Sequence, residues 1–486
     1  MEENKPEADN QFEVRAFGRD ALTYSTGTIL LFIFGLIQAF LIPKYLSLES
    51  YGYWQLFCLY SSYAGILHVG FCDGILVRWA GKRLGDIGDE VRVAFRFLLL
   101  EQVVAIIPLG LLIYFLLTPP YQWIGLIILP FAFTVNLTTF FRFTAQSIKK
   151  FPFLTAVSVG RGLIQLIIVV GLFVSGSLNY QYVIIATLIA HIIAVIVFTF
   201  RFRQDLSGKM PAFSSLLSFG YRNIGVGIFI LLGNFVVDLF LTIDRLMVSF
   251  FFELEQFAVY ALALSVALMA NTVVRAISDV FFPYLSGAAI QFRSQAYQIG
   301  KSAIIIAGAA ILAAYFPVVL FIEFYLPRYT GSLPMMQILL CSVGLNSLIQ
   351  ILHTNYYKIS GLQREYFLWA IASLVISVIL NYIAIEFWGT LTSVAIATVI
   401  SVMIWYVVNE IRLKQTVEQT NKQIMKGIGI IICYIGVFWL SFLLSEGLIL
   451  QMLIYIAFFL ILTWLFFHNE VKMFVAGVKG IRNKRE

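Results

Sequence analysis

Residues 181–203 read QYVIIATLIAHIIAVIVFTFRFR, an apolar run that ends in two arginines. A helix needs about 20 predominantly apolar residues to cross the hydrocarbon core of a bilayer, so residues 181–200 predict a transmembrane helix. Thirteen other stretches have the same character, and fourteen spans are therefore predicted. They cover residues 21–42, 53–77, 95–117, 122–145, 153–174, 181–200, 222–243, 255–277, 302–324, 334–353, 366–387, 390–411, 426–445 and 448–467.

The composition excludes a soluble protein. The 486 residues are 60% hydrophobic and only 12% charged, whereas soluble domains carry about 25% charged residues. Too few charges remain to cover the surfaces of soluble domains, and the mean hydropathy of +0.89 agrees with this. The predicted fold class is an all-α polytopic membrane protein.

The distribution of basic residues tests the number of spans. With a cytoplasmic N-terminus, 30 of the 33 lysines and arginines fall on the cytoplasmic side, and only Lys44, Arg245 and Arg328 fall outside. Cytoplasmic segments of membrane proteins are enriched in Lys and Arg, so both termini are predicted to be cytoplasmic. Arg161 fits this pattern least, because it lies well inside its span.

Two sets of six spans share an ordered series of short matches. Phe17-Gly18 precedes the first span as Phe219-Gly220 precedes the seventh, and Pro43-Lys44 ends the first span as Asp244-Arg245 ends the seventh. Copies of six spans enter the membrane from the same side, which makes a parallel repeat, an architecture of secondary transporters. The predicted divisions are a cytoplasmic tail (1–20), an N-lobe (21–205), a C-lobe (206–411) and two further spans with a basic tail (412–486).

No sequence pattern predicts catalysis. Gly300-Lys301-Ser302 resembles the end of a nucleotide-binding loop, but Gln295 stands where that motif requires glycine. The four histidines lie on different spans without metal-ligand spacing and are interpreted as packed side chains. The short outer loops leave no room for a catalytic domain. We therefore predict a protein that is not an enzyme and has no cofactor or metal, with H⁺ or Na⁺ as candidate coupling ions.

Ionisable residues at membrane depth are the candidates for function, because a charge at a helix centre costs about 2.5–3.5 kcal/mol and usually faces a cavity or a partner. Guanidinium groups bind phosphate bidentately and stay charged, so the basic set predicts an anion-binding cleft. Its members are Arg19, Arg78, Arg142, Arg222, Arg275, Lys44 and Arg245. The candidate coupling or charge-partner carboxylates are Asp73, Glu101, Asp238, Asp244 and Asp279. The alternative for the inner arginines is that they only set topology, and Arg275 and Asp279, four residues apart, alternatively pair with each other.

Several segments resemble a known transporter family. They are PKYLSLESYGYW at 43–54, GFCDGILVRWAGK at 70–82 and TIDRLMVSFFFELEQFAVYALA at 242–263. In the third segment Asp244, Arg245, Glu255 and Tyr260 match the family pattern, while Ala258 replaces the usual glycine. The chain is similar over nearly its whole length to the Wzx-type oligosaccharide flippases of the MOP superfamily, which also contains the MATE efflux pumps.

The resemblance implies a MATE-like fold and a function. The implied substrate is an undecaprenyl-pyrophosphate-linked oligosaccharide, which alternating access moves from the inner to the outer leaflet of the bacterial cell membrane. The resemblance also favours four arginines as residues that line the cavity: Arg19, Arg78, Arg222 and Arg275. Implied partners are membrane lipids and a polysaccharide polymerase with other assembly proteins, and no nucleic acid. The alternatives are a MATE-like antiporter of organic cations, a peptidoglycan lipid-precursor flippase, and a membrane enzyme acting on lipid-linked sugars.

Overall fold

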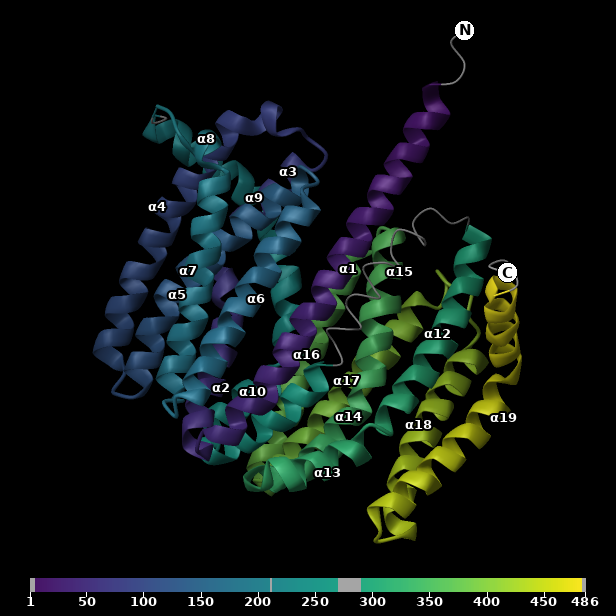
Figure 1. Ribbon diagram of the computed structural model, residues 1–486. Helices are drawn as coiled ribbons and strands as arrows, with labels where there is room; N and C mark the ends of the chain where they lie inside the picture. Colours follow the sequence, from purple (N-terminus) through teal and green to yellow (C-terminus); the bar gives the residue numbers. More distant parts are fainter. Residues whose placement is uncertain (1–4, 210–211, 270–289, 483–486) are drawn as a thin grey trace. The chain divides into compact units, whose positions relative to one another are not determined.

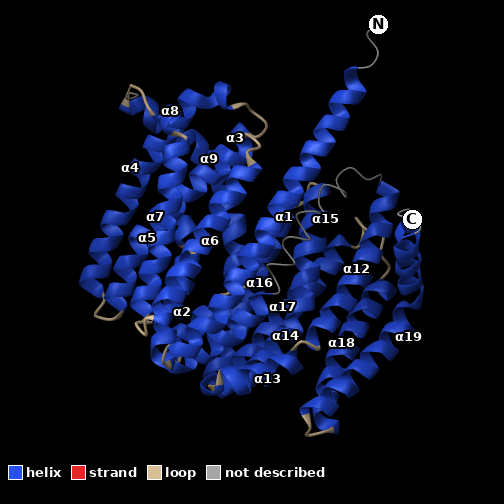
Figure 2. Ribbon diagram, viewed as in Figure 1, coloured by secondary structure: helices blue, strands red, loops and turns tan. Residues whose placement is uncertain are grey.

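The computed structural model describes residues 5–209, 212–269 and 290–482, with side chains for residues 23, 26–209, 212–269 and 293–468. All regular structure within these ranges is helical (Figure 2). Twelve of the described helices are long and apolar enough to cross a membrane. The chain divides into two compact units, residues 1–238 and 239–486. The lobe boundary at residue 205 stays a prediction.

Unit 1 contains the helices that Figure 1 colours from purple to teal. In order they are α1 (Lys5–Tyr45), α2 (Leu48–Ser62), the short 3₁₀ helix η1 (Ala64–His68), α3 (Phe71–Trp79), α4 (Leu84–Leu116), α5 (Tyr121–Ser147), α6 (Phe151–Val174), α7 (Tyr180–Arg201), α8 (Arg203–Leu206) and α9 (Phe213–Phe240), whose last two residues belong to unit 2. Of the predicted spans in this unit, only the second is not one continuous helix, because it is divided among α2, η1 and α3.

Unit 2 continues to the C-terminus. Its elements are α10 (Ile243–Phe251), a helix at Leu254–Met269, α12 (Ile290–Leu312), α13 (Tyr315–Tyr325), η2 (Pro327–Ser332), α14 (Leu333–Ser347), the π-helix η3 (Leu348–His353), α15 (Thr354–Ile359), α16 (Gln363–Trp388), α17 (Leu391–Leu413), α18 (Asn421–Leu444) and α19 (Leu448–Arg482). The eighth predicted span, 255–277, corresponds to the helix at Leu254–Met269, and its last residues lie outside the described ranges. The other twelve predicted spans coincide with the twelve long apolar stretches of helix. Two of these stretches join several elements: Arg293–Tyr325 contains α12 and α13, and Pro327–Ile359 contains η2, α14, η3 and α15.

Aromatic side chains form the interior of unit 1. Phe141 on α5 stacks on Phe198 at 5.6 Å between ring centroids and on Phe202 at 5.7 Å. Trp79 of α3 is fully buried, and its indole nitrogen donates to Glu90 on α4 at 2.7 Å. This interior fixes α3, α4, α5 and α7 as one body.

Large apolar side chains also cover much of the outside of both units. Phe115 on α4 is 77% exposed and Leu443 on α18 is 83% exposed. Such surfaces would be unstable in water, whereas lipid tails solvate them at no cost, so the long helices identify a multi-pass membrane protein.

Candidate functional site

The second predicted span of unit 1 is broken near its middle. Val69 and Gly70 adopt positive φ angles of 43° and 82°, which end η1 and begin α3. A broken helix leaves carbonyl oxygens without intrahelical partners, and in a membrane other protein groups must satisfy them. Discontinuous helices of this kind recur at the binding sites of transporters.

Two buried amides stabilise the break. Gln102 on α4 donates its Nε2 to the Leu67 carbonyl at 3.0 Å, and Asn136 on α5 donates its Nδ2 to the Ala64 carbonyl at 3.2 Å. Asn136 Nδ2 also lies 2.8 Å from the Oε1 atom of Gln102, so the two amides form one network. Both residues are 0% exposed. The break is therefore an ordered feature of the fold.

The backbone of helix α9 packs directly against the backbone of this broken span. A Cβ atom added to Gly74 of α3 would collide with the Asn223 carbonyl, and one added to Gly70 would lie 2.5 Å from the Ile228 nitrogen. Only glycine permits this approach at both positions. It places the side chains of α3 and α9 within reach of each other.

Two predicted anion-binding residues meet at this crossing. Arg78 of α3 donates from Nη1 to Asn223 Oδ1 at 3.1 Å. The guanidinium carbons of Arg78 and Arg222 lie 5.8 and 5.9 Å from the centre of the Phe219 ring. An aromatic face attracts cations, so Phe219 holds two positive charges near one place. We call Arg78, Arg222 and Phe219 the cationic patch.

Two predicted carboxylates lie deeper in unit 1. Asp73 is 7% exposed, and its Oδ2 lies 3.8 Å from His68 Nε2. Both carboxylate oxygens of Glu101, halfway along α4, are buried without a hydrogen-bond partner among the described residues. Burial of such a group without a partner is costly, and structures retain it mainly where it binds an ion or a proton.

The other predicted residues of unit 1 do not join the patch. Arg142 is exposed, with its guanidinium 5.0 Å from the ring of its neighbour Phe143. Asp238 is exposed on α9, and Lys44 is half-buried in the last turn of α1. The side chain of Arg19 and the whole of Arg275 and Asp279 lie outside the described residues.

In unit 2 Asp244 is the centre of a buried oxygen cluster. It is 1% exposed and accepts the Tyr260 hydroxyl at 2.7 Å and the Thr398 hydroxyl at 3.1 Å. The Thr398 oxygen is also 3.5 Å from Asn381 Oδ1. The neighbouring Arg245 is buried as well, 5.8 Å from the Phe257 ring.

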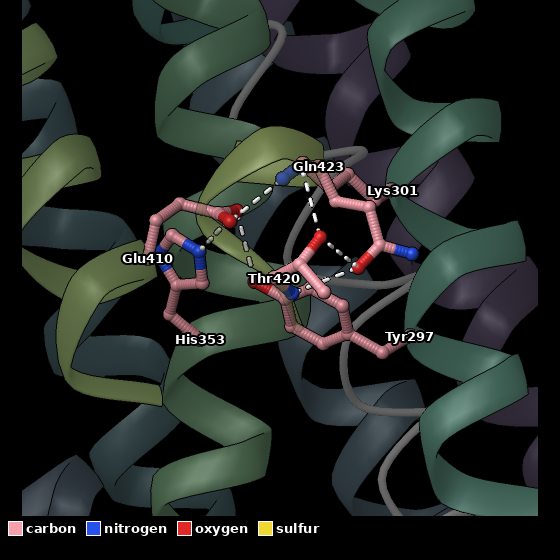
Figure 3. A network of polar contacts seen from close by, with 6 residues as sticks. All are labelled: Tyr297, Lys301, His353, Glu410, Thr420 and Gln423. Carbon is pink, nitrogen blue, oxygen red and sulfur yellow. Dashed lines mark hydrogen bonds and ion pairs between the residues drawn. The ribbon is translucent and has the colours of Figure 1, made fainter. Parts of the chain in front are cut away.

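Sequence reasoning did not find a second network in unit 2, which Figure 3 shows. Lys301 on α12 and Glu410 on α17 form an ion pair of 2.6 Å. Tyr297 donates its hydroxyl to Glu410 at 2.9 Å, and His353 Nε2 lies 3.3 Å from the same carboxylate. Glu410 and His353 are 0% exposed and Lys301 is 3% exposed. These four residues, the Glu410 network, join α12, η3 and α17.

The Glu410 network also lies against α18. A Cβ atom on Gly427 would be 2.9 Å from Lys301 Cε, so glycine allows α18 to pass over the lysine. Thr420 and Gln423, drawn beside the network in Figure 3, form the capping box that begins α18. In the sequence, Lys301 stood out only in the rejected Gly300-Lys301-Ser302 match, and His353 was one of the four histidines interpreted as packed.

Comparisons with known proteins support the fold. No protein-family model and no curated protein matches the sequence. A structure titled lipid II flippase MurJ, inward closed conformation, has a TM-score of 0.68 and 16% identity, covering 93% of this chain and 100% of that chain. An inward-facing multidrug resistance MATE family transporter of the MOP superfamily has a TM-score of 0.60 and 12% identity, covering 82% and 99%. A structure of the outward-facing conformation of such a transporter has a TM-score of 0.57 and 14% identity, covering 82% of this chain and 95% of that chain. The chain therefore shares the fold of these structures.

Proposed function

We propose that this protein is a flippase that moves undecaprenyl-pyrophosphate-linked oligosaccharides from the inner to the outer leaflet of a bacterial cell membrane by alternating access. The cationic patch is the observation that carries the proposal. Two guanidinium groups on one ring offer bidentate hydrogen bonds to the oxygens of a diphosphate. A site for organic cations would instead place carboxylates in this position.

The resemblance to Wzx-type sequences and the fold shared with a lipid II flippase support the choice of a lipid-linked substrate. A diphosphate-linked sugar chain cannot cross hydrocarbon unaided. A protein with an apolar exterior and a cationic patch lets the lipid tail stay in the bilayer while the head group crosses. The proposed partners are lipids and the polymerase that consumes the flipped oligosaccharide.

We also propose that transport is coupled to a cation at Asp244. The oxygens of Asp244, Asn381 and Thr398 are of the hard type that Na⁺ and similar cations prefer, and Asp244 itself is a group that H⁺ could protonate. Glu101 of unit 1 is the second coupling candidate, because its carboxylate has no partner among the described residues.

The test in cells replaces Arg78 and Arg222 together with alanine. We expect surface polysaccharide of the source organism to fall by about tenfold or more, because two charge-assisted contacts to phosphate are lost. Arg201→Ala is the matched control, since Arg201 also lies over aromatic rings, 6.0 Å from Phe153, but outside the patch. Unchanged polysaccharide together with lost drug resistance would favour the antiporter alternative, and loss of viability without polysaccharide change would favour a peptidoglycan-precursor flippase.

A further inference from the structure

Arg161 is a charged residue in the middle of a membrane-spanning helix. It is the eleventh of the 24 residues of α6 and is half-buried. The cost of a charge at this depth is usually offset by a counter-ion. Within the described residues Arg161 makes no ion pair with a carboxylate; its hydrogen-bond partner is His191 on α7, with Nη1 and Nε2 separated by 3.0 Å.

The helix segments around Arg161 contain no acidic residue, because every aspartate and glutamate of α1 precedes residue 21. Helix α6 packs against α1, α5 and α7. Neither α5, α6 and α7 nor residues 21–45 of α1 include any aspartate or glutamate. Within these segments Arg161 therefore has no carboxylate with which to pair.

His191 is held so that it accepts a hydrogen bond from Arg161 and carries no charge. Its Nδ1 lies 3.0 Å from the Thr187 carbonyl oxygen. A carbonyl oxygen accepts only, so Nδ1 carries the proton and Nε2 presents a lone pair to the guanidinium. The pair keeps a net charge of +1.

Two nitrogens of the guanidinium make no hydrogen bond to a described residue. Nη1 bonds to His191, while Nε and Nη2 have no hydrogen-bond partner among the described residues. These two nitrogens form the fork that matches two oxygens of a phosphate or a carboxylate. One turn along, Gln165 Nε2 donates to the Thr187 hydroxyl at 3.1 Å, which fixes α6 against α7 and orients the site.

We propose that Arg161, positioned by His191, is an oxyanion-binding site inside unit 1, separate from the cationic patch. Its ligand class is a phosphate or carboxylate group, which neutralises a charge that no carboxylate among the described residues compensates. The identity of the ligand rests on the proposed function: the oxyanion comes either from the diphosphate or from an acidic sugar of the transported head group. Arg161 binds the anion, and His191 is a positioning residue.

The test measures binding of inorganic pyrophosphate to the full chain in nanodiscs by calorimetry. Arg78→Gln and Arg222→Gln are present throughout, so that the cationic patch does not contribute. We expect the remaining binding to weaken about tenfold or more when Arg161→Gln is added, as for loss of a charge-assisted contact. Arg201→Gln serves as the control and should leave binding unchanged.

Three companion variants separate binding from folding. Arg161→Lys keeps the charge without the fork and should retain partial affinity. His191→Gln retains an acceptor and should preserve most binding, whereas His191→Phe retains an aromatic ring without an acceptor and should weaken it. Binding of both pyrophosphate and glucuronate that is insensitive to Arg161→Gln, or equal loss for both histidine variants, would overturn the assignment.

Glucuronate, tested in parallel, distinguishes the sources of the oxyanion. Binding of pyrophosphate alone assigns the site to the diphosphate, and binding of glucuronate alone assigns it to an acidic sugar; if neither binds through Arg161, the site is wrong. If pyrophosphate binding depends on Arg161 but the chain flips no lipid-linked substrate, the oxyanion site stands and the proposed flippase function fails. If the chain flips the substrate but no binding depends on Arg161, the flippase function stands and the oxyanion site fails.

Discussion

The Glu410 network of unit 2 and the Arg161 and Glu101 sites of unit 1 bury their charges in opposite ways. In unit 2 Lys301 Nζ lies 2.6 Å from the Glu410 carboxylate, which also contacts the side chains of His353 and Tyr297. In unit 1 Arg161 contacts a neutral histidine, and Glu101 has no partner among the described residues. A compensated charge stabilises the fold in place, whereas an uncompensated one costs stability and is retained for a ligand, ion or proton. We expect charges of the first kind to stabilise the fold and those of the second kind to serve the proposed transport.

The largest effect is expected from breaking the Glu410 network on one side only. Lys301→Met leaves the Glu410 carboxylate buried without its cation, which should cost about 3–5 kcal/mol of stability. Thermal unfolding of the purified protein in detergent measures the loss. Adding Glu410→Gln should restore most of the stability, because the unpaired carboxylate charge is then gone. A double variant as unstable as Lys301→Met would show that the unpaired charge of Glu410 is not the cause of the loss.

A smaller loss is expected where α9 crosses the broken span. Gly74→Ala forces a methyl group against the Asn223 carbonyl, and overpacking of this kind costs about 1–3 kcal/mol. The shift should also separate Arg78 from Asn223 and lower transport. Gly85→Ala is the matched control, because a Cβ there meets no atom within 4 Å. Equal behaviour of the two variants would mean that the close approach of α3 and α9 does not build the cationic patch.

The smallest effect on stability is expected in unit 1. Glu101→Gln and Arg161→Met remove uncompensated groups, so thermal stability should stay unchanged or rise, because the cost of burial disappears. Transport should nevertheless fall for both. A loss of stability comparable to that of Lys301→Met would show that Glu101 and Arg161 stabilise the fold as the Glu410 network does, which contradicts the comparison.

The spans were predictable from the sequence because hydropathy and the distribution of Lys and Arg are properties of local stretches. Twelve predicted spans coincide with long helices. The break at Val69-Gly70 was not predicted, since the local sequence stays apolar and the carbonyls are satisfied by Gln102 and Asn136, which lie far along the chain.

The sites were predictable only in part. Arg78 and Arg222 were selected singly for their depth and residue type, but their shared ring, Phe219, depends on the crossing of α3 and α9. Lys301 and Glu410 are 109 residues apart, so no spacing rule joins them. Arg161 appeared only as an exception to the charge pattern, and its uncompensated state required knowing which helices surround it.

The central claim is tested most directly by transport in proteoliposomes. The purified full chain is reconstituted with a fluorescent undecaprenyl-pyrophosphate-linked oligosaccharide, and the fraction reaching the opposite leaflet is measured by its exposure to a membrane-impermeant quencher. We predict rapid equilibration by the wild type and by Arg201→Ala, and a rate lowered by about tenfold or more for Arg78→Ala with Arg222→Ala. Equilibration no faster than in protein-free vesicles, or an unchanged rate in the double variant, would contradict the account.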